Sequence, residues 1–219
     1  MPLASSDEPG AEQRQEPRLA LLLRTAKVVS PQGEFLCIIR DVSEGGVRLR
    51  LFHLLPESFD GGLVELGNGA QFGVERVWES NGEAGFRFTQ PIDLEAFMGE
   101  ASPYPKRAIR LCMDVPAEIA FAGQQIPVRI HDLSRQGACI ESEELLARGQ
   151  VLRIKGPHLP EIEATVCWRR APNYGLVFDR IMTMSDLAER AAAMQGALAA
   201  RSSDPVQAGR NFIASPFMQ

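Results

Sequence analysis

Asp41, Ser43 and Gly46 stand together in the segment DVSEGG, between an apolar run and a run of alternating polar and apolar residues. A carboxylate can accept the N1–H and N2–H donors of guanine, and a serine hydroxyl can bond a phosphate or fix a turn. Glycine permits a positive φ or a close backbone approach. This set suits the binding of a nucleotide, but the same residues also make ordinary turns between strands.

Two arginines, Arg14 and Arg18, precede this segment in RQEPR, where Pro17 favours an extended chain. The guanidinium fork fits phosphate oxygens or the O6/N7 edge of guanine, and its plane stacks on a base. Alone, the two arginines would be solvated charges on a terminal segment. Together with the Asp/Ser/Gly segment they indicate a binding site.

The chain contains this pattern twice, at an offset of about 90 residues. The segment DLSRQG supplies the second set, and the two tryptophans fall at equivalent places, seven residues before a glycine. The second set is Arg110, Asp132, Ser134, Gly137 and Trp168. We therefore expect two copies of one small domain.

The second copy departs from the first at its start, which reads PKRAIR. Lys106 stands where the first arginine is expected, and Arg107 lies one residue away. Lysine offers a point charge in place of the bidentate fork. The second site is thus a weaker one, a site that uses Arg107, or a barrel that keeps only its turn.

Each copy contains short alternating runs separated by Gly-, Pro- and Asn-rich turns, which is typical of a small antiparallel barrel or sandwich. In VRLRLF the apolar residues point one way and Arg48 and Arg50 the other. The run IEATVCWRR predicts Ile162, Ala164, Val166 and Trp168 on one face. Arg76 interrupts the corresponding stripe, which indicates a bulge or a barrel mouth. Both tryptophans are expected in the core.

The expected organisation has six parts. A flexible tail (1–13) precedes the first barrel (14–92), a linker with a short helix (93–103) and the second barrel (104–182). A C-terminal helix (183–201) and a second flexible tail (202–219) follow. Thr183 is the expected N-cap of that helix, with Asp186 at its third position, and its apolar stripe is expected to dock on its own domain.

The two motifs resemble the signature of the PilZ domain, RxxxR ahead of the first strand and DxSxxG at the end of the second. The later W…GFRF and W…YGLVF segments are similar to the end of that barrel. The resemblance covers roughly residues 14–90 and 104–180. It implies six-stranded β-barrels and, as ligand, cyclic di-GMP, held in the first copy by Arg14, Arg18, Asp41, Ser43 and Gly46. A second site would use Lys106, Arg107, Arg110, Asp132, Ser134 and Gly137.

Composition narrows the function classes. The net charge of −5 disfavours DNA or RNA as a partner. The four cysteines form no CxxC pair, so core thiols are expected rather than a zinc site, and no other cofactor or metal is expected. No apolar run is long enough to span a membrane, and no signal peptide is visible, which indicates a cytoplasmic protein. No catalytic constellation repeats between the copies, so an enzyme is not expected.

We therefore expect a bacterial sensor or effector that couples cyclic di-GMP binding to a conformational change and to regulation of a protein partner. Outputs in the family are motility and surface polysaccharide synthesis. The alternative is a ligand-independent adaptor, in which the barrels and the C-terminal helix serve only protein contacts or homodimerisation. A barrel that binds single-stranded nucleic acid would need exposed aromatics and positive charge.

Overall fold

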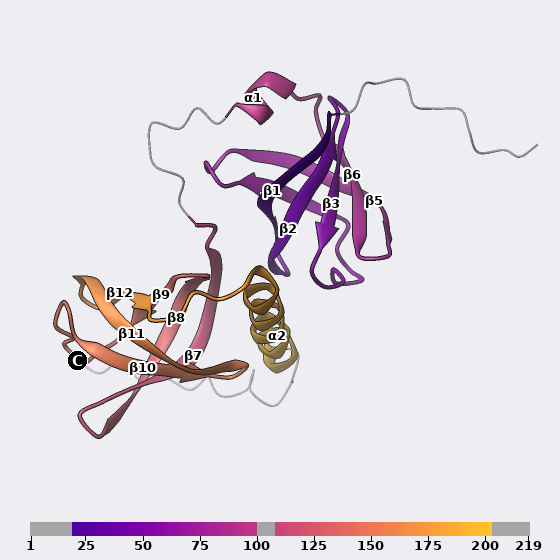
Figure 1. Cartoon of the computed structure of the whole chain (residues 1–219). Helices are drawn as coiled ribbons and strands as arrows, with labels where there is room; N and C mark the ends of the chain where they lie inside the picture. The colour runs from indigo at the N-terminus through magenta and orange to yellow at the C-terminus, as the bar shows by residue number, and fades with distance from the viewer. Residues whose placement is uncertain (1–18, 100–107, 203–219) are drawn as a thin grey trace, which may run out of the picture.

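Six strands close the first barrel in the computed structural model, which describes residues 19–99 and 108–202 of the chain (Figure 1). The strands are β1 (Leu19–Ser30), β2 (Gly33–Val42), β3 (Gly46–Leu51), β4 (Gly61–Leu66), β5 (Gln71–Ser80) and β6 (Glu83–Phe88). Their order around the barrel is β1-β2-β3-β6-β5-β4, and β1 pairs with β4 to close it.

The second barrel repeats this arrangement in the order β7-β8-β9-β12-β11-β10. Its strands are β7 (Leu111–Phe121), β8 (Gln124–Ser134), β9 (Gly137–Glu141), β10 (Val151–Gly156), β11 (Leu159–Arg170) and β12 (Asn173–Phe178). Every neighbouring pair in both barrels is antiparallel. The prediction of two tandem six-stranded antiparallel barrels is confirmed.

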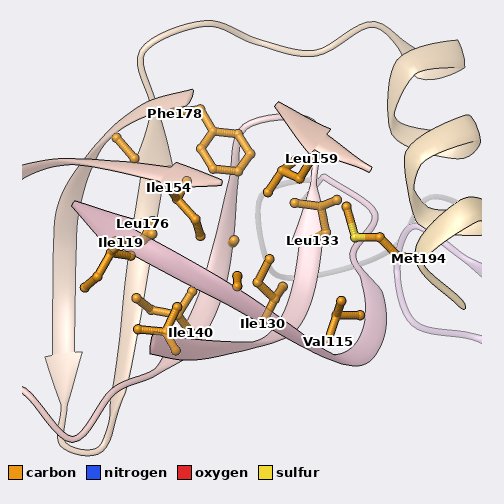
Figure 2. Close-up of a cluster of buried hydrophobic side chains, with 14 of the residues drawn as sticks. Val115, Ile119, Ile130, Leu133, Ile140, Ile154, Leu159, Leu176, Phe178 and Met194 are labelled. Atoms are coloured by element: carbon orange, nitrogen blue, oxygen red, sulfur yellow. The ribbon is translucent and has the colours of Figure 1, made fainter. Parts of the chain in front are cut away.

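Period-two alternation explains which side chains fill each barrel. In β3 the side chains of Val47, Leu49 and Leu51 are buried, whereas Arg50 is exposed. Aromatic residues fill much of the first core, where the rings of Phe72, Phe88 and Phe97 pack against one another. Aliphatic side chains fill most of the second core, with Ile119, Ile130 and Ile140 at its centre (Figure 2).

A β-bulge reverses the expected orientation of each tryptophan. The register between β11 and β12 shifts between Val166 and Trp168, so Trp168 pairs with Gly175 and faces outward. The equivalent shift in the first barrel lies between Arg76 and Trp78. Trp78 is 42% exposed and Trp168 37% exposed. The prediction that they are core residues is wrong, because the extra residue in a bulge moves the following side chain to the other face.

Arg76 itself lies at the register shift of β5, so the interrupted stripe marks a bulge, which was one of the two predicted explanations. Its guanidinium lies 6.0 Å from the centre of the Phe59 ring and donates to Glu79 Oε2 over 3.1 Å. Val166 occupies the equivalent inward position of the second barrel and is fully buried.

The helix α1 (Leu94–Met98) follows the first barrel and packs onto it. Asp93 caps its N-terminus by accepting the Glu95 N–H over 2.9 Å, and Phe97 is fully buried in the barrel core. The guanidinium of Arg24 in β1 donates to the carbonyl oxygens of Phe97 and Met98 at the other end of the helix. These contacts satisfy groups that a helix end leaves without intrahelical partners.

The helix α2 (Met184–Ser202) begins at a capping box. Asp186 N–H donates to Thr183 Oγ1 over 3.0 Å, and the Thr183 N–H and hydroxyl donate to the Asp186 carboxylate. These hydrogen bonds hold the pKa of Asp186 below its ordinary value. The predicted cap is thus confirmed. Leu187, Ala191 and Met194 are buried in the second core, as the stripe predicted (Figure 2), whereas the side chain of Leu198 is outside the described set.

Helix α2 also contacts the first barrel, which the sequence did not indicate (Figure 1). The buried Gln195 side chain pairs with the backbone of Glu34 in β2, where Oε1 accepts the N–H over 2.6 Å and Nε2 donates to the carbonyl over 2.9 Å. Leu36, which faces away from the first core, is 1% exposed within the second hydrophobic cluster. The helix therefore joins the two barrels.

Polar contacts complete this interface. Lys27 Nζ donates to Glu34 Oε2 over 2.9 Å and to the Arg110 carbonyl over 3.0 Å, and Glu34 Oε2 also accepts the Cys112 N–H over 2.7 Å. We call Lys27, Glu34, Arg110, Cys112 and Gln195 the inter-barrel cluster. Burial lowers the pKa of Lys27, but the hydrogen bonds and charges of Glu34 and Glu65 outweigh it and raise that pKa above its ordinary value.

The four cysteines are free, but only Cys37 is a core thiol. Burial raises the pKa of its thiol. Cys112 is exposed, and Cys139 and Cys167 are half-buried, so the expectation of core thiols is wrong for these three, which do not point into the barrel core. Neither helix in the described ranges is both long and apolar enough to cross a bilayer. The predicted tail 1–13 and residues 203–219 lie outside the described residues.

Candidate functional site

The predicted site residues fall into two groups. Arg14, Arg18, Lys106 and Arg107 lie outside the described residues. Those that the structure describes end the second strand of each barrel or lie next to it, and they are Asp41, Ser43, Gly46, Arg110, Asp132, Ser134 and Gly137.

The DxSxxG loop of the first barrel forms a tight turn between β2 and β3. The Ser43 N–H donates to the Gly46 carbonyl over 2.8 Å, and its buried hydroxyl is directed at the same oxygen, 3.5 Å away. A Cβ at Gly46 would lie 2.6 Å from the Phe86 carbonyl oxygen, so this position requires glycine for close packing. Ser43 and Gly46 therefore shape the loop.

The second loop has the same structure, which supports the repeat. The Ser134 hydroxyl donates to the Gly137 carbonyl over 3.1 Å, and a Cβ at Gly137 would lie 1.9 Å from the Leu176 carbonyl oxygen. Both loops also hold the chain that leaves the barrel. The backbone carbonyl of Glu44 accepts the Ile92 N–H in the first barrel, and the backbone carbonyl of Arg135 accepts the Met182 N–H in the second. Each loop is thus tied to the segment that precedes a helix.

A row of four residues crosses the outside of the first barrel next to this loop. Asp41 in β2 is opposite Arg48 in β3, Arg48 is opposite Gly85 in β6, and Gly85 is opposite Trp78 in β5. Arg48 Nε lies 2.7 Å from Asp41 Oδ2. We call this the first-barrel row. It places a carboxylate, a guanidinium and an indole side by side.

Gly85 gives the indole its place in the row. A Cβ there would lie 2.1 Å from Trp78 Nε1 and 2.5 Å from Cε2, so the pyrrole part of the indole covers the glycine. The seven-residue spacing of tryptophan and glycine follows from this cross-strand pairing. An exposed aromatic surface of this kind can stack on a nucleobase.

Other charges surround Arg48. Glu83 in β6 lies between two arginines, with Oε2 3.7 Å from Arg48 Nη1 and Oε1 3.6 Å from Arg40 Nε. Arg48 is the more exposed member of its pair with Asp41, at 39% against 8% for the side chains. The guanidinium is therefore available to an anion while its other side is held by a carboxylate.

The second barrel has an equivalent row with different chemistry. Its members, from β7 to β11, are Cys112, Asp132, Cys139, Gly175 and Trp168. Cys139 replaces Arg48, and the indole again covers a glycine, since a Cβ at Gly175 would lie 2.0 Å from Trp168 Nε1. Asp132 pairs here with Arg110, whose Nη1 lies 2.6 Å from Asp132 Oδ1. The row therefore lacks the cross-strand arginine.

The sequence pointed to Asp41 but not to Arg48 and Trp78. A signal for Arg48 was present, because residues 43–45 form the turn of a hairpin and the position opposite Asp41 on the next strand is occupied by an arginine. A signal for Trp78 was the spacing to Gly85, which an indole stacked over a glycine explains. Within the described residues, no group of three His, Cys, Asp or Glu side chains is placed to hold a metal ion.

Two tandem barrels, each with a DxSxxG turn beside an outer row that ends in tryptophan over glycine, define a duplicated β-barrel fold. The model of the PilZ domain matches residues 12–99 and 106–191. The chain therefore belongs to the PilZ family and contains two PilZ domains in tandem. A comparison with curated protein sequences gives no match.

Similar solved structures include three other proteins. Borreliella burgdorferi PlzA in complex with c-di-GMP is 16% identical, with a TM-score of 0.34, over 78% of this chain and 87% of PlzA. Escherichia coli YcgR in complex with c-di-GMP is 13% identical, with a TM-score of 0.27, over 86% and 89%. The K. pneumoniae MrkH–c-di-GMP complex is 11% identical, with a TM-score of 0.29, over 82% and 89%. The family assignment rests on the match to the family model.

Proposed function

We propose that the first barrel binds cyclic di-GMP and that the protein is a sensor or effector for this second messenger. The observation that carries the proposal is the first-barrel row, in which Asp41, Arg48 and Trp78 lie side by side at the end of β2. Guanine and phosphate together need a carboxylate, guanidinium groups and an aromatic surface. Membership of the PilZ family supports the same ligand.

Each residue has a distinct role in this proposal. The Asp41 carboxylate accepts from the guanine N1–H and N2–H, and Arg48 bonds a phosphate or the O6/N7 edge. The Trp78 indole stacks on a base. Arg14 and Arg18 close over the ligand from the segment before β1. Ser43 and Gly46 act by shaping the turn that positions Asp41.

The second barrel is proposed to bind the same ligand more weakly. Its row has Cys139 at the place of Arg48, and Lys106 stands in place of an arginine. The loss of one charge-assisted bidentate contact costs about 1.5–3 kcal/mol, which corresponds to roughly tenfold to a hundredfold in affinity.

The proposed mechanism links ligand binding to the arrangement of the barrels. Residues 10–18 close over the first-barrel row, the first barrel turns relative to the second, and the new surface binds or releases a protein partner. The inter-barrel cluster is the contact that such a turn would change. We propose a cytoplasmic, non-enzymatic regulator of motility, surface polysaccharide or a related output, without a nucleic-acid partner.

A ligand-independent adaptor is the competing function, and one observation favours it. Both described aspartates of the motifs already have an ion pair, Asp41 with Arg48 and Asp132 with Arg110. In an adaptor these pairs would only hold the strands together. In a sensor, by contrast, the aspartate and the arginine of each ion pair must give up their contact to bind the ligand.

Isothermal titration calorimetry with cyclic di-GMP separates the two functions. The sensor predicts a tight binding event at micromolar or lower concentration that Arg14→Ala/Arg18→Ala abolishes, so that only the weaker binding of the second barrel is left. Arg153→Ala is the matched control, since it removes an exposed arginine of the second barrel that pairs with Glu161. The absence of binding by the intact chain would leave the adaptor as the better account.

A further inference from the structure

The outer surface of the second barrel carries an apolar row that the first barrel lacks. Val151 in β10 is opposite Thr165 in β11, and Thr165 is opposite Val177 in β12. Val151 is 56% exposed and Val177 48% exposed. We call these three residues the apolar row. Single exposed apolar side chains are ordinary, but two exposed valines that flank a half-buried threonine across three strands offer a contact surface.

The first barrel shows that the fold does not require this row. Its equivalent positions are Gly61, Glu75 and Arg87, in the same register across β4, β5 and β6. Arg87 Nη2 lies 2.6 Å from Glu75 Oε2, so a surface ion pair occupies the place of Thr165 and Val177. The same barrel therefore forms with charges at these positions, and the apolar side chains serve something other than folding.

A groove of about 680 Å³ lies beside the apolar row. Arg153 and Glu163 are a cross-strand pair two residues along β10 and β11 from the row, and the exposed Ile181 also lines the groove. The charged and apolar residues that line it include Arg153, Glu161, Glu163, Asp179, Arg180 and Ile181.

The groove carries side chains of both charges, so its surface is complementary to the same surface on a second copy of the chain. Arg153 is paired with Glu161, but across the residues that the structure describes no ion pair involves Glu163, Asp179 or Arg180. Two carboxylates and one guanidinium without partners thus lie in one groove next to exposed valines. A surface with both signs matches neither a strongly acidic nor a strongly basic partner. It matches a copy of itself, because a two-fold axis brings residue i against j and j against i.

We propose that this face is the contact between two copies of the chain. The apolar rows of the two copies pack at the centre, and Arg180 of each copy faces Glu163 and Asp179 of the other. A closed two-fold dimer follows, because each surface is used once. This dimer does not depend on nucleotide binding and leaves the first-barrel row exposed.

Sedimentation equilibrium of the full chain without nucleotide tests the proposal. We expect a monomer–dimer equilibrium whose dissociation constant rises at least about 30-fold in Thr165→Glu/Val177→Arg, as for the loss of a central contact. These substitutions copy the first barrel, so the variant is expected to fold, and its melting temperature checks that it does. A wild-type chain that stays monomeric at every concentration, or a dimer that these substitutions leave unchanged, would overturn the proposal.

A charge exchange gives a second, independent readout. Arg180→Glu makes the groove acidic, and Glu163→Arg/Asp179→Arg makes it basic, so each variant alone is expected to be monomeric. A mixture is expected to form a heterodimer, because each arginine then faces a carboxylate of the other chain. Folded variants that stay monomeric when mixed would contradict the pairing.

Discussion

The guanidinium of Arg110, the residue just before β7, lies 2.6 Å from the carboxylate of Asp132 and so neutralises the second motif. In the first barrel the carboxylate of Asp41 is paired at 2.7 Å from the strand after it, by Arg48. Within the described residues, each copy thus pairs its motif aspartate with an arginine from a different neighbouring segment. Because position 139 is cysteine, the described row of the second barrel has no cross-strand arginine that could replace Arg110 if a ligand attracted it away.

Exchanging the residues that differ between the two rows should therefore change the affinity of each barrel for cyclic di-GMP. In a chain with Arg14→Ala/Arg18→Ala, where only the second barrel can bind, Lys106→Arg/Cys139→Arg should raise cyclic di-GMP affinity roughly tenfold to a hundredfold. Calorimetry measures this gain, and Cys139→Gln is the control without a charge. In the wild-type background, Arg48→Cys should lower affinity by a similar factor. An exchange without effect in either direction would show that the row does not contact ligand.

Trp78 should report ligand binding and Trp168 should not, or only at higher ligand concentration. Trp168→Phe leaves Trp78 as the single tryptophan, and cyclic di-GMP should quench or shift its emission as the base stacks on the indole. Trp78→Phe leaves only Trp168 and serves as the matched control, because that indole also covers a glycine. Equal changes in the two variants, or a change in Trp168 alone, would place the ligand elsewhere.

Alternation and turn residues predicted two small antiparallel units of barrel or sandwich type, since strands with period two must bury one face, and the resemblance to the PilZ domain supplied the six-stranded barrel. They could not predict the face of Trp168, because a single extra residue between Val166 and Trp168 reverses the alternation. The same limit applies to the inter-barrel cluster. Lys27 and Arg110 are 83 residues apart, and nothing local to either one indicates that they meet.

The candidate site, like the fold, could be predicted only in part from the sequence. The offset between the copies identified Asp41 and Asp132, since a repeated motif needs no tertiary information. Arg48 and Trp78 became visible only through cross-strand pairing, which brings residues 7 and 37 positions away from Asp41 into one row. The roles of Ser43 and Gly46 also needed the structure, because both act on the backbone of their own turn.

Gln195 should stabilise the whole chain through its contacts with β2. Gln195→Ala leaves the Glu34 N–H and carbonyl without their partners, and a buried unsatisfied group costs about 1–3 kcal/mol. Chemical denaturation measures the free energy of unfolding. Gln125→Ala, at an exposed hairpin position, should change it by less than about 0.5 kcal/mol. Equal effects of the two substitutions would mean that α2 does not hold the first barrel in solution.

Lys27 should make the inter-barrel contact sensitive to alkaline pH. Its pKa in the folded protein lies above the ordinary value of 10.5, so its stabilising effect is complete below that value and is lost as pH rises through the folded pKa. Lys27→Met should lower the free energy of unfolding by about 1–3 kcal/mol near neutral pH. The difference between wild type and variant should stay constant up to about pH 10 and shrink above it. A difference that shrinks on acidification would contradict the assignment.

The central claim is that the first-barrel row is a cyclic di-GMP site, and the two equivalent aspartates test it most directly. Calorimetry with cyclic di-GMP on Asp41→Ala and Asp132→Ala compares the same substitution in the same turn of the two barrels. We expect Asp41→Ala to abolish the tight binding event and Asp132→Ala to preserve it, with both variants folded. Tight binding that survives Asp41→Ala, or that disappears only with Asp132→Ala, would contradict the claim and move the site out of the first barrel.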